Sequence, residues 1–93
     1  MSGGTPTADV RLPRSLAALF PGNRRQIPAS GSTLAEVIYD LDRTMPGIRD
    51  RLVTAGPSLR RHINVFVNGE QSDLATPVPP GAIVHVIPAV SGG

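Results

Sequence analysis

Ser32-Thr33-Leu34-Ala35-Glu36-Val37-Ile38-Tyr39-Asp40-Leu41 is the stretch of this sequence that decides the fold. Ser32 or Thr33 supplies an N-cap oxygen, and Thr33-Leu34-Ala35-Glu36 has the spacing of a capping box. The apolar residues fall at i, i+3, i+4 and i+7 of a helix: Leu34, Val37, Ile38 and Leu41. Met45-Pro46-Gly47 ends the helix, because proline disfavours helical geometry in the residue before it. The stretch therefore predicts one amphipathic helix with a single apolar face.

Upstream of this helix the sequence predicts a hairpin. Val10 and Leu12 alternate with polar neighbours up to Pro13, which is typical of a half-buried strand that starts at Ala8. The range 25–28 is a short candidate for the returning strand. The connection between them holds a small apolar cluster, for which capping one end of the core is favoured over an exposed contact. Its members are Leu16, Leu19 and Phe20.

Downstream of the helix the sequence predicts a second strand pair. Apolar residues alternate along 63–67 and stop at Asn68-Gly69, the strongest short-range hairpin signal. After a proline-rich turn at 77–81, the range 82–87 is apolar apart from His85. If Val84 and Val86 face the helix, the other side of this strand faces outward beside Phe66. An exposed apolar patch on a sheet usually marks a partner surface. We name this candidate surface the outer patch: Phe66, His85 and Ile87.

The element order is strand, strand, helix, strand and, after short pieces, a last strand. It predicts the α+β class and a β-grasp (ubiquitin-like) arrangement, in which a mixed sheet of four to five strands is covered by one main helix. The crossover makes the first and last strands parallel neighbours. We expect a β-grasp domain at 8–88 between a flexible N-terminal leader at 1–7 and a flexible C-terminal tail at 89–93.

Composition limits the possible chemistry. The 93 residues suit one domain, and the absence of cysteine removes disulfides, a thiol nucleophile and any Cys-based metal site. His62 and His85 have no spacing that favours a shared metal. No apolar stretch approaches the roughly 20 residues that span a bilayer, so we expect no membrane partner and a cytoplasmic location.

Charge argues against nucleic acid as a partner. The net charge is +2, and the sequence has one Tyr, two Phe and no Trp for stacking on bases. We interpret the pairs Arg24-Arg25 and Arg60-Arg61 as solvated loop charges. Every basic side chain except histidine is an arginine, so no lysine amine is present to accept an isopeptide bond. If tails are joined to amines, this chain is the donor.

The sequence ends Ile87-Pro88-Ala89-Val90-Ser91-Gly92-Gly93. Glycine has no Cβ, so two in succession give the narrowest and most flexible backbone available. A free Gly-Gly carboxylate therefore enters a tunnel that is closed to other dipeptides. We expect this carboxylate to be the working group, and an incidental Gly-Gly is the alternative.

Three motifs carry a resemblance to a known family. Val-Asn-Gly at 67–69, Pro-Pro-Gly at 79–81 and the terminal Ile-Pro-Ala-Val-Ser-Gly-Gly resemble those of the ubiquitin-like sulfur carriers. That family includes the small subunit of molybdopterin synthase and the sulfur carrier of thiamine biosynthesis. The tail and the extended connection between the first two strands are most similar to the actinobacterial carrier that feeds cysteine synthesis. The resemblance covers about residues 8–93.

The resemblance implies a mechanism that needs no catalytic side chain. An E1-like enzyme uses ATP to adenylate the Gly93 carboxylate, and a sulfur donor displaces AMP to leave a thiocarboxylate. The thiocarboxylate then delivers a tethered, nucleophilic sulfur to an acceptor enzyme. The chain would be a protein cosubstrate rather than an enzyme, with no bound cofactor, because the partner consumes the ATP. The residues implied in partner binding are Ala89, Val90, Ser91 and Gly92 of the tail and Phe66, His85 and Ile87 of the outer patch.

The sequence leaves the destination of the sulfur open. A cysteine synthase-like acceptor is the first choice, a thiosugar synthase-like or other secondary-metabolite enzyme the second, and molybdopterin or thiamine biosynthesis the third. Two other classes also remain. The first alternative is a protein modifier ligated through Gly93. The second is a non-covalent β-grasp interaction module, in which the outer patch binds the partner and the tail has no role.

Overall fold

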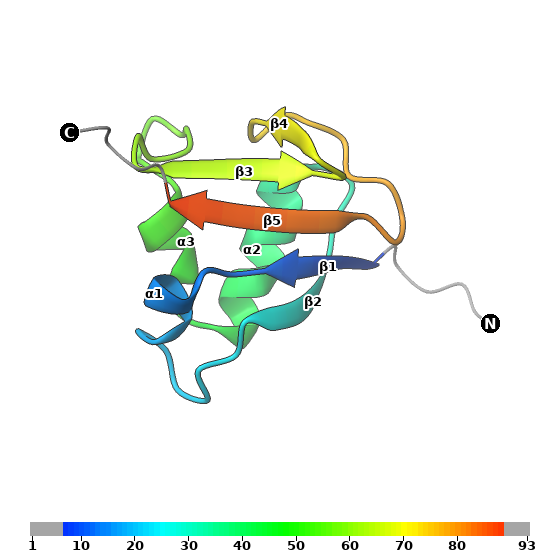
Figure 1. Ribbon diagram of the computed structural model, residues 1–93. Coiled ribbons are helices and arrows are strands. Elements are labelled where there is room, and N and C mark those ends of the chain that lie inside the picture. Colours follow the sequence, from blue (N-terminus) through cyan, green and yellow to red (C-terminus); the bar gives the residue numbers. More distant parts are fainter. Residues whose placement is uncertain (1–6, 89–93) are drawn as a thin grey trace.

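A five-stranded mixed sheet with the strand order β2-β1-β5-β3-β4 forms one layer of the molecule, and the helices cover one of its faces (Figure 1). This computed structural model describes residues 7–88. The strands are β1 (Thr7–Arg11), β2 (Gln26–Ser30), β3 (Ile63–Val67), β4 (Glu70–Ser72) and β5 (Ile83–Pro88). The helices are α1 (Arg14–Ala17), α2 (Leu34–Thr44) and α3 (Ile48–Leu52). The predicted β-grasp class is confirmed.

Side-chain caps define both ends of α2. The Thr33 hydroxyl oxygen accepts a hydrogen bond from the backbone N–H of Glu36 at 3.3 Å, and the Glu36 carboxylate accepts one from the N–H of Ser32 at 3.0 Å. At the other end Gly47 has φ +100°, which only glycine adopts without strain. One Asp42 oxygen accepts hydrogen bonds from the N–H groups of Gly47 and Arg49, each at 3.0 Å. These bonds fix the turn between α2 and α3.

The strand pairings place β5 at the centre of the sheet. β1 pairs with β2 and β3 pairs with β4, both antiparallel, so the two predicted hairpins are confirmed. β5 lies between the hairpins, parallel to β1 and antiparallel to β3. The β3–β4 turn uses Asn68 and Gly69 at φ +51° and +86°, the left-handed conformations that a two-residue hairpin loop requires.

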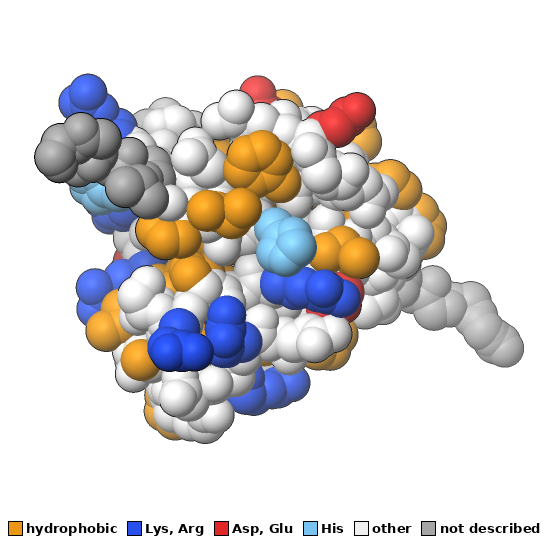
Figure 2. Space-filling view, viewed as in Figure 1, with side chains coloured by type: hydrophobic (Ala, Val, Ile, Leu, Met, Phe, Trp, Pro, Cys, Tyr) orange, Lys and Arg blue, Asp and Glu red, His pale blue; other side chains and the backbone are white. Residues whose placement is uncertain are grey.

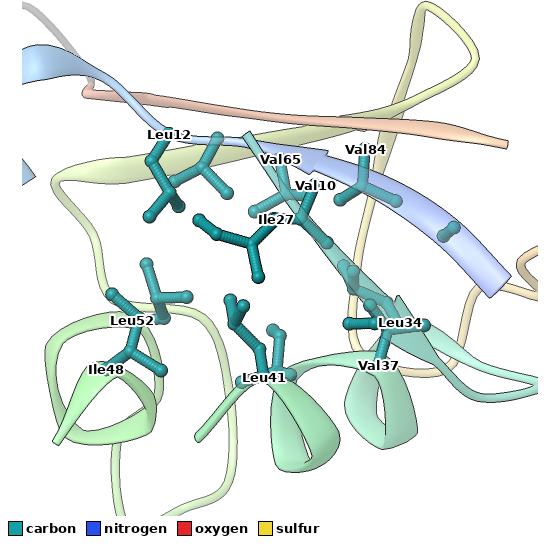
Figure 3. Packing of buried hydrophobic residues seen from close by; sticks show 14 of the residues in the cluster. Val10, Leu12, Ile27, Leu34, Val37, Leu41, Ile48, Leu52, Val65 and Val84 are labelled. Carbon is teal, nitrogen blue, oxygen red and sulfur yellow. The ribbon is translucent and has the colours of Figure 1, made fainter. Parts of the chain in front are cut away.

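The core fills the space between the sheet and the helices (Figure 3). Ile27 and Val65 are fully buried on the sheet side, and Leu34 and Leu41 of α2 face them. The wall is completed by α3, whose Ile48 is also fully buried. One continuous cluster of apolar side chains therefore holds the sheet to the helical layer.

The chain between β2 and α2 approaches the helix too closely for any side chain. A Cβ built on Gly31 would lie 2.6 Å from the backbone nitrogen of Val37 and 2.7 Å from the carbonyl carbon of Glu36. Both contacts are with backbone atoms, which have little room to move. Glycine at position 31 is thus what allows β2 to turn directly into α2.

The β1–β2 connection differs from expectation in detail. It contains the one-turn helix α1, and the predicted capping cluster is divided. Leu16 is buried and Phe20 packs against the core, as capping requires, whereas Leu19 is 54% exposed. β2 also runs two residues past the predicted end at 28, because its pairing with β1 continues to Ser30.

Candidate functional site

The end of β5 is where the predicted working segment joins the domain. Pro88, the last residue of β5, is opposite Ile63 at the start of β3. Residue 89 is bonded to Pro88, so the terminal segment starts at this end of the central strand. The predicted site residues Ala89, Val90, Ser91, Gly92 and Gly93 lie outside the described residues.

The outer patch forms one continuous surface on the sheet face that the helices leave uncovered (Figure 2). Phe66 is directly opposite His85 on the neighbouring strand, and Ile87 is opposite Asn64. Val84 and Val86 point into the core at 1% and 3% exposure. Because side chains alternate along a strand, Ile83, His85 and Ile87 face outward. The predicted orientation is confirmed, and its role in partner binding stays a prediction.

An open hollow lies beside the end of β5. Its volume is about 540 Å³, and it is lined by residues of the three neighbouring strands β1, β2 and β5, of the segment after β1 and of the position before β2. The lining residues are Arg11, Leu12, Pro13, Arg25, Gln26 and the run His85–Pro88. This hollow cannot be predicted from the sequence, because residues from 11–13, 25–26 and 85–88 are brought together only by the strand register.

Hydrogen bonds order the charged wall of this hollow. The Arg11 guanidinium donates to an Asp9 carboxylate oxygen at 3.1 Å, and the same oxygen accepts from the Gln26 amide at 2.9 Å. The Arg25 Nε donates to the backbone carbonyl of Leu12 at 3.4 Å. A guanidinium has five donors, so both arginines keep donors for a further partner.

The carboxylates on α2 have structural partners. Asp40 accepts a hydrogen bond from the backbone N–H of Ser30 at 2.8 Å, while Asp42 binds the turn that follows the helix. They therefore act on different parts of the fold, as expected of residues two apart on a helix. Across residues 7–88, no group of three or more His, Asp or Glu side chains is placed to hold a metal ion.

The helices of the described region are also too short or too polar to cross a membrane. What the described residues offer is a binding surface: an apolar patch, an adjoining hollow with arginines, and the start of the terminal segment between them. Such a surface is typical of a chain that binds other proteins.

Comparisons with known proteins agree with this arrangement. Over 78 residues, the chain is 38% identical to the sulfur carrier protein CysO of Mycobacterium tuberculosis; the match covers 77% of this chain and 84% of the relative. The crystal structure of M. tuberculosis CysO matches with a TM-score of 0.81 and 36% identity, over 89% of this chain and 99% of the other. A chain in the Amycolatopsis orientalis BexX/CysO complex matches with a TM-score of 0.83 and 34% identity, over 92% of this chain and 99% of that chain.

The comparison with protein families extends through the terminal segment. The model of the ThiS family matches residues 10–93, from β1 to the final glycine. The match includes both the described domain and the diglycine. This chain therefore belongs to the ThiS family.

Proposed function

We propose that this chain is a sulfur carrier protein whose reactive group is the carboxylate of Gly93. The observation that carries the proposal is the ThiS family match, which runs from β1 through the diglycine. The position of β5 supports it, because a segment that starts at the end of a central, paired strand is presented from a rigid body. The relatives named CysO are themselves sulfur carrier proteins.

The proposed chemistry has two steps. An E1-like enzyme transfers AMP from ATP to a Gly93 carboxylate oxygen and releases pyrophosphate. A sulfide-level donor then attacks the acyl carbon, AMP leaves with that oxygen, and a thiocarboxylate remains. A carboxylate is a poor acyl donor until its oxygen becomes part of a good leaving group, which the acyl phosphate supplies. ATP is thus a substrate of the partner, and this chain is a cosubstrate.

Cysteine biosynthesis is the proposed destination of the sulfur, with thiosugar biosynthesis as the alternative. The CysO relatives favour cysteine biosynthesis. The BexX/CysO complex is a reason to keep an alternative, because there a relative of this chain is found together with a second protein, BexX. The acceptor is tested by incubating the thiocarboxylated chain with a cysteine synthase-like and a thiosugar synthase-like enzyme of the same organism. The acceptor is the enzyme that, with its co-substrate, joins the thiocarboxylate sulfur to the co-substrate fragment. This is seen as the mass of the thioester adduct, or as the carboxylate mass once water has cleaved that thioester.

Intact-protein mass spectrometry tests the proposal. The chain is incubated with ATP, sulfide and an E1-like enzyme from the same organism. We expect a mass gain equal to the difference between sulfur and oxygen, localised to Gly93 by fragmentation. A variant that lacks Gly93 serves as control, and should fold normally and show no gain.

Two results would contradict the carrier role. Covalent adducts of higher mass with other proteins in cells, formed through Gly93, would identify a protein modifier. No mass change with an enzyme shown to be active on another carrier would leave the non-covalent interaction module.

A further inference from the structure

Arginines that are dispersed in the sequence gather around the end of β5. Arg11 and Arg25 line the hollow that also contains Ile87 and Pro88. On the other side of β5, the N–H of Ile63, the residue opposite Pro88, donates to the carbonyl of Arg60 at 3.0 Å. We call this group the arginine rim: Arg11, Arg24, Arg25, Arg60 and Arg61.

Most of the rim is not neutralised by the protein itself. Arg11 pairs with Asp9 at 3.1 Å. Within the described residues, by contrast, no carboxylate lies within ion-pair distance of Arg24, Arg25, Arg60 or Arg61, and all four are exposed. Arg60 is oriented by a hydrogen bond from its Nε to the backbone carbonyl of Asp50 at 2.7 Å. The rim thus presents guanidinium groups with unused donors to solvent.

Some acidic residues lie toward the opposite end of the sheet, whereas Asp50 lies beside the rim, where its backbone carbonyl accepts the hydrogen bond from Arg60. Glu70 is paired with Val67, near the start of β5, whereas the Asp9 carboxylate lies at the hollow, where it accepts from Arg11 and Gln26. Asp40 binds the last residue of β2, at the same end as Glu70. In Figure 2 the basic side chains lie mostly on the left, where β5 ends, and acidic ones at the upper right. Among the described residues, the rim arginines without a carboxylate partner therefore make the end of β5 more positive than the net charge of +2 suggests.

We propose that the arginine rim binds Asp and Glu carboxylates that surround the tail entrance of the activating enzyme. This inference rests on the proposed function, because it names the surface that the E1-like partner meets first. Planar guanidinium groups bind carboxylates through two parallel hydrogen bonds. Charges of opposite sign placed around the reacting segment accelerate encounter and orient the two proteins before the apolar contacts form.

The surroundings of the rim favour a protein over a polyanion. Ile87 and Pro88 lie in the same hollow as Arg11 and Arg25, so an apolar surface adjoins the charges. An apolar centre with a charged edge is typical of protein interfaces. Single-stranded nucleic acid stacks successive bases on several aromatic platforms. Among the described residues, the outer face has one such ring, the partly exposed Phe66, and the exposed Tyr39 belongs to α2, in the helical layer.

Two charge-reversal pairs test the inference. Arg24→Glu with Arg61→Glu changes two rim residues that are exposed and have no side-chain hydrogen bond within the described region. Arg43→Glu with Arg49→Glu makes the same change of net charge on α2 and α3, in the helical layer. Stopped-flow association with the E1-like enzyme is measured from about 50 to 500 mM NaCl, the range over which screening becomes strong. Urea unfolding confirms that both variants are folded.

We expect the rim variant to associate at least about tenfold more slowly at low salt and to approach the unaltered chain at high salt. The control pair should stay within about twofold. Equal losses in both pairs would attribute the effect to net charge and overturn the inference, as would no loss in either. If the unaltered chain still gains sulfur, only the rim inference fails and the proposed carrier function stands. If the unaltered chain gains no sulfur, the carrier function and the rim inference are both overturned.

A polyanion is the remaining competitor for the rim. Fluorescence anisotropy with a labelled single-stranded DNA and co-sedimentation with phosphatidylserine vesicles use the same two variants. We expect no binding to either probe at physiological salt. Binding that the rim variant loses and the control variant keeps would assign the rim to phosphate recognition and overturn the inference.

Discussion

The two faces of the sheet have similar side chains and different neighbours. On the inner face of β5, Val84 and Val86 are 1% and 3% exposed beneath the helices, whereas Ile83 and Ile87 on the outer face are 37% and 42% exposed. Both sides of β5 thus have apolar side chains, although the core needs only the side that packs under the helices. Apolar side chains that the fold leaves uncovered are available for binding another protein. The inner face stabilises the domain, and we infer that the outer face serves its partners.

The largest expected effect is on the inner face. Ile27→Ala removes a fully buried side chain from β2 and leaves a cavity between the sheet and α2. We expect the free energy of unfolding to fall by about 2–5 kcal/mol, measured by urea denaturation. A loss as small as that of an outer-face substitution would mean that the inner face is loosely packed and that the two faces do not differ in this way.

The next effect concerns the turn that brings α2 onto the inner face. Gly31→Ala places a methyl group 2.6 Å from the backbone nitrogen of Val37, so the chain must shift. We expect a loss of about 1–3 kcal/mol in urea unfolding. Gly69→Ala is the control, because it meets nothing within 4 Å and costs only what its φ of +86° imposes, about 1 kcal/mol. Equal midpoints for Gly31→Ala and the unaltered chain would contradict the close approach.

A smaller effect is expected at the start of α2. Thr33→Ala removes the hydroxyl that accepts a hydrogen bond from the Glu36 N–H, and should lower the free energy of unfolding by about 1 kcal/mol. Thr33→Ser keeps the hydroxyl and should recover most of this loss. If serine is no better than alanine, the cap does not help to hold the helix on the sheet.

The smallest effect on stability, with the clearest effect on function, is expected on the outer face. Ile87→Ala should change the free energy of unfolding by less than about 1 kcal/mol, because the side chain is already 42% exposed. We expect kcat/KM for thiocarboxylate formation to fall about tenfold, as for a central interface residue.

Tyr39→Ala is the matched control for the outer face. This side chain is 61% exposed on α2, in the helical layer. The substitution should change neither the unfolding midpoint nor the rate of thiocarboxylate formation. Equal rate losses in Ile87→Ala and Tyr39→Ala would remove the distinction between the outer face and the rest of the surface.

Local patterns were enough to predict most of this fold. The helix at α2 has a capping box, a regular apolar period and a glycine stop, and each of these acts within a few residues. Asn68-Gly69 specifies its hairpin in the same local way. Once the element order is known, the crossover dictates that β1 and β5 are parallel neighbours, as observed.

The features that were missed depend on short or distant relations. α1 has four residues, Arg14–Ala17, fewer than the helical period needs to be recognised. The hollow and the arginine rim join 11–13, 24–26, 60–61 and 85–88, so they appear only when the strand register is known. Arg24-Arg25 and Arg60-Arg61 were correctly interpreted as exposed, but their common location could not be predicted from sequence spacing.

The central position of β5 also determines when this domain is completed during synthesis. Ribosomes make the β1–β2 hairpin, α2 and the β3–β4 hairpin first, and the strand that joins the two hairpins is made after all of these. A chain released before residue 83 lacks the parallel pairing with β1 and the antiparallel pairing with β3. Unfinished chains therefore lack the assembled sheet and the residues after it, and under the proposed function they offer an activating enzyme no group to charge.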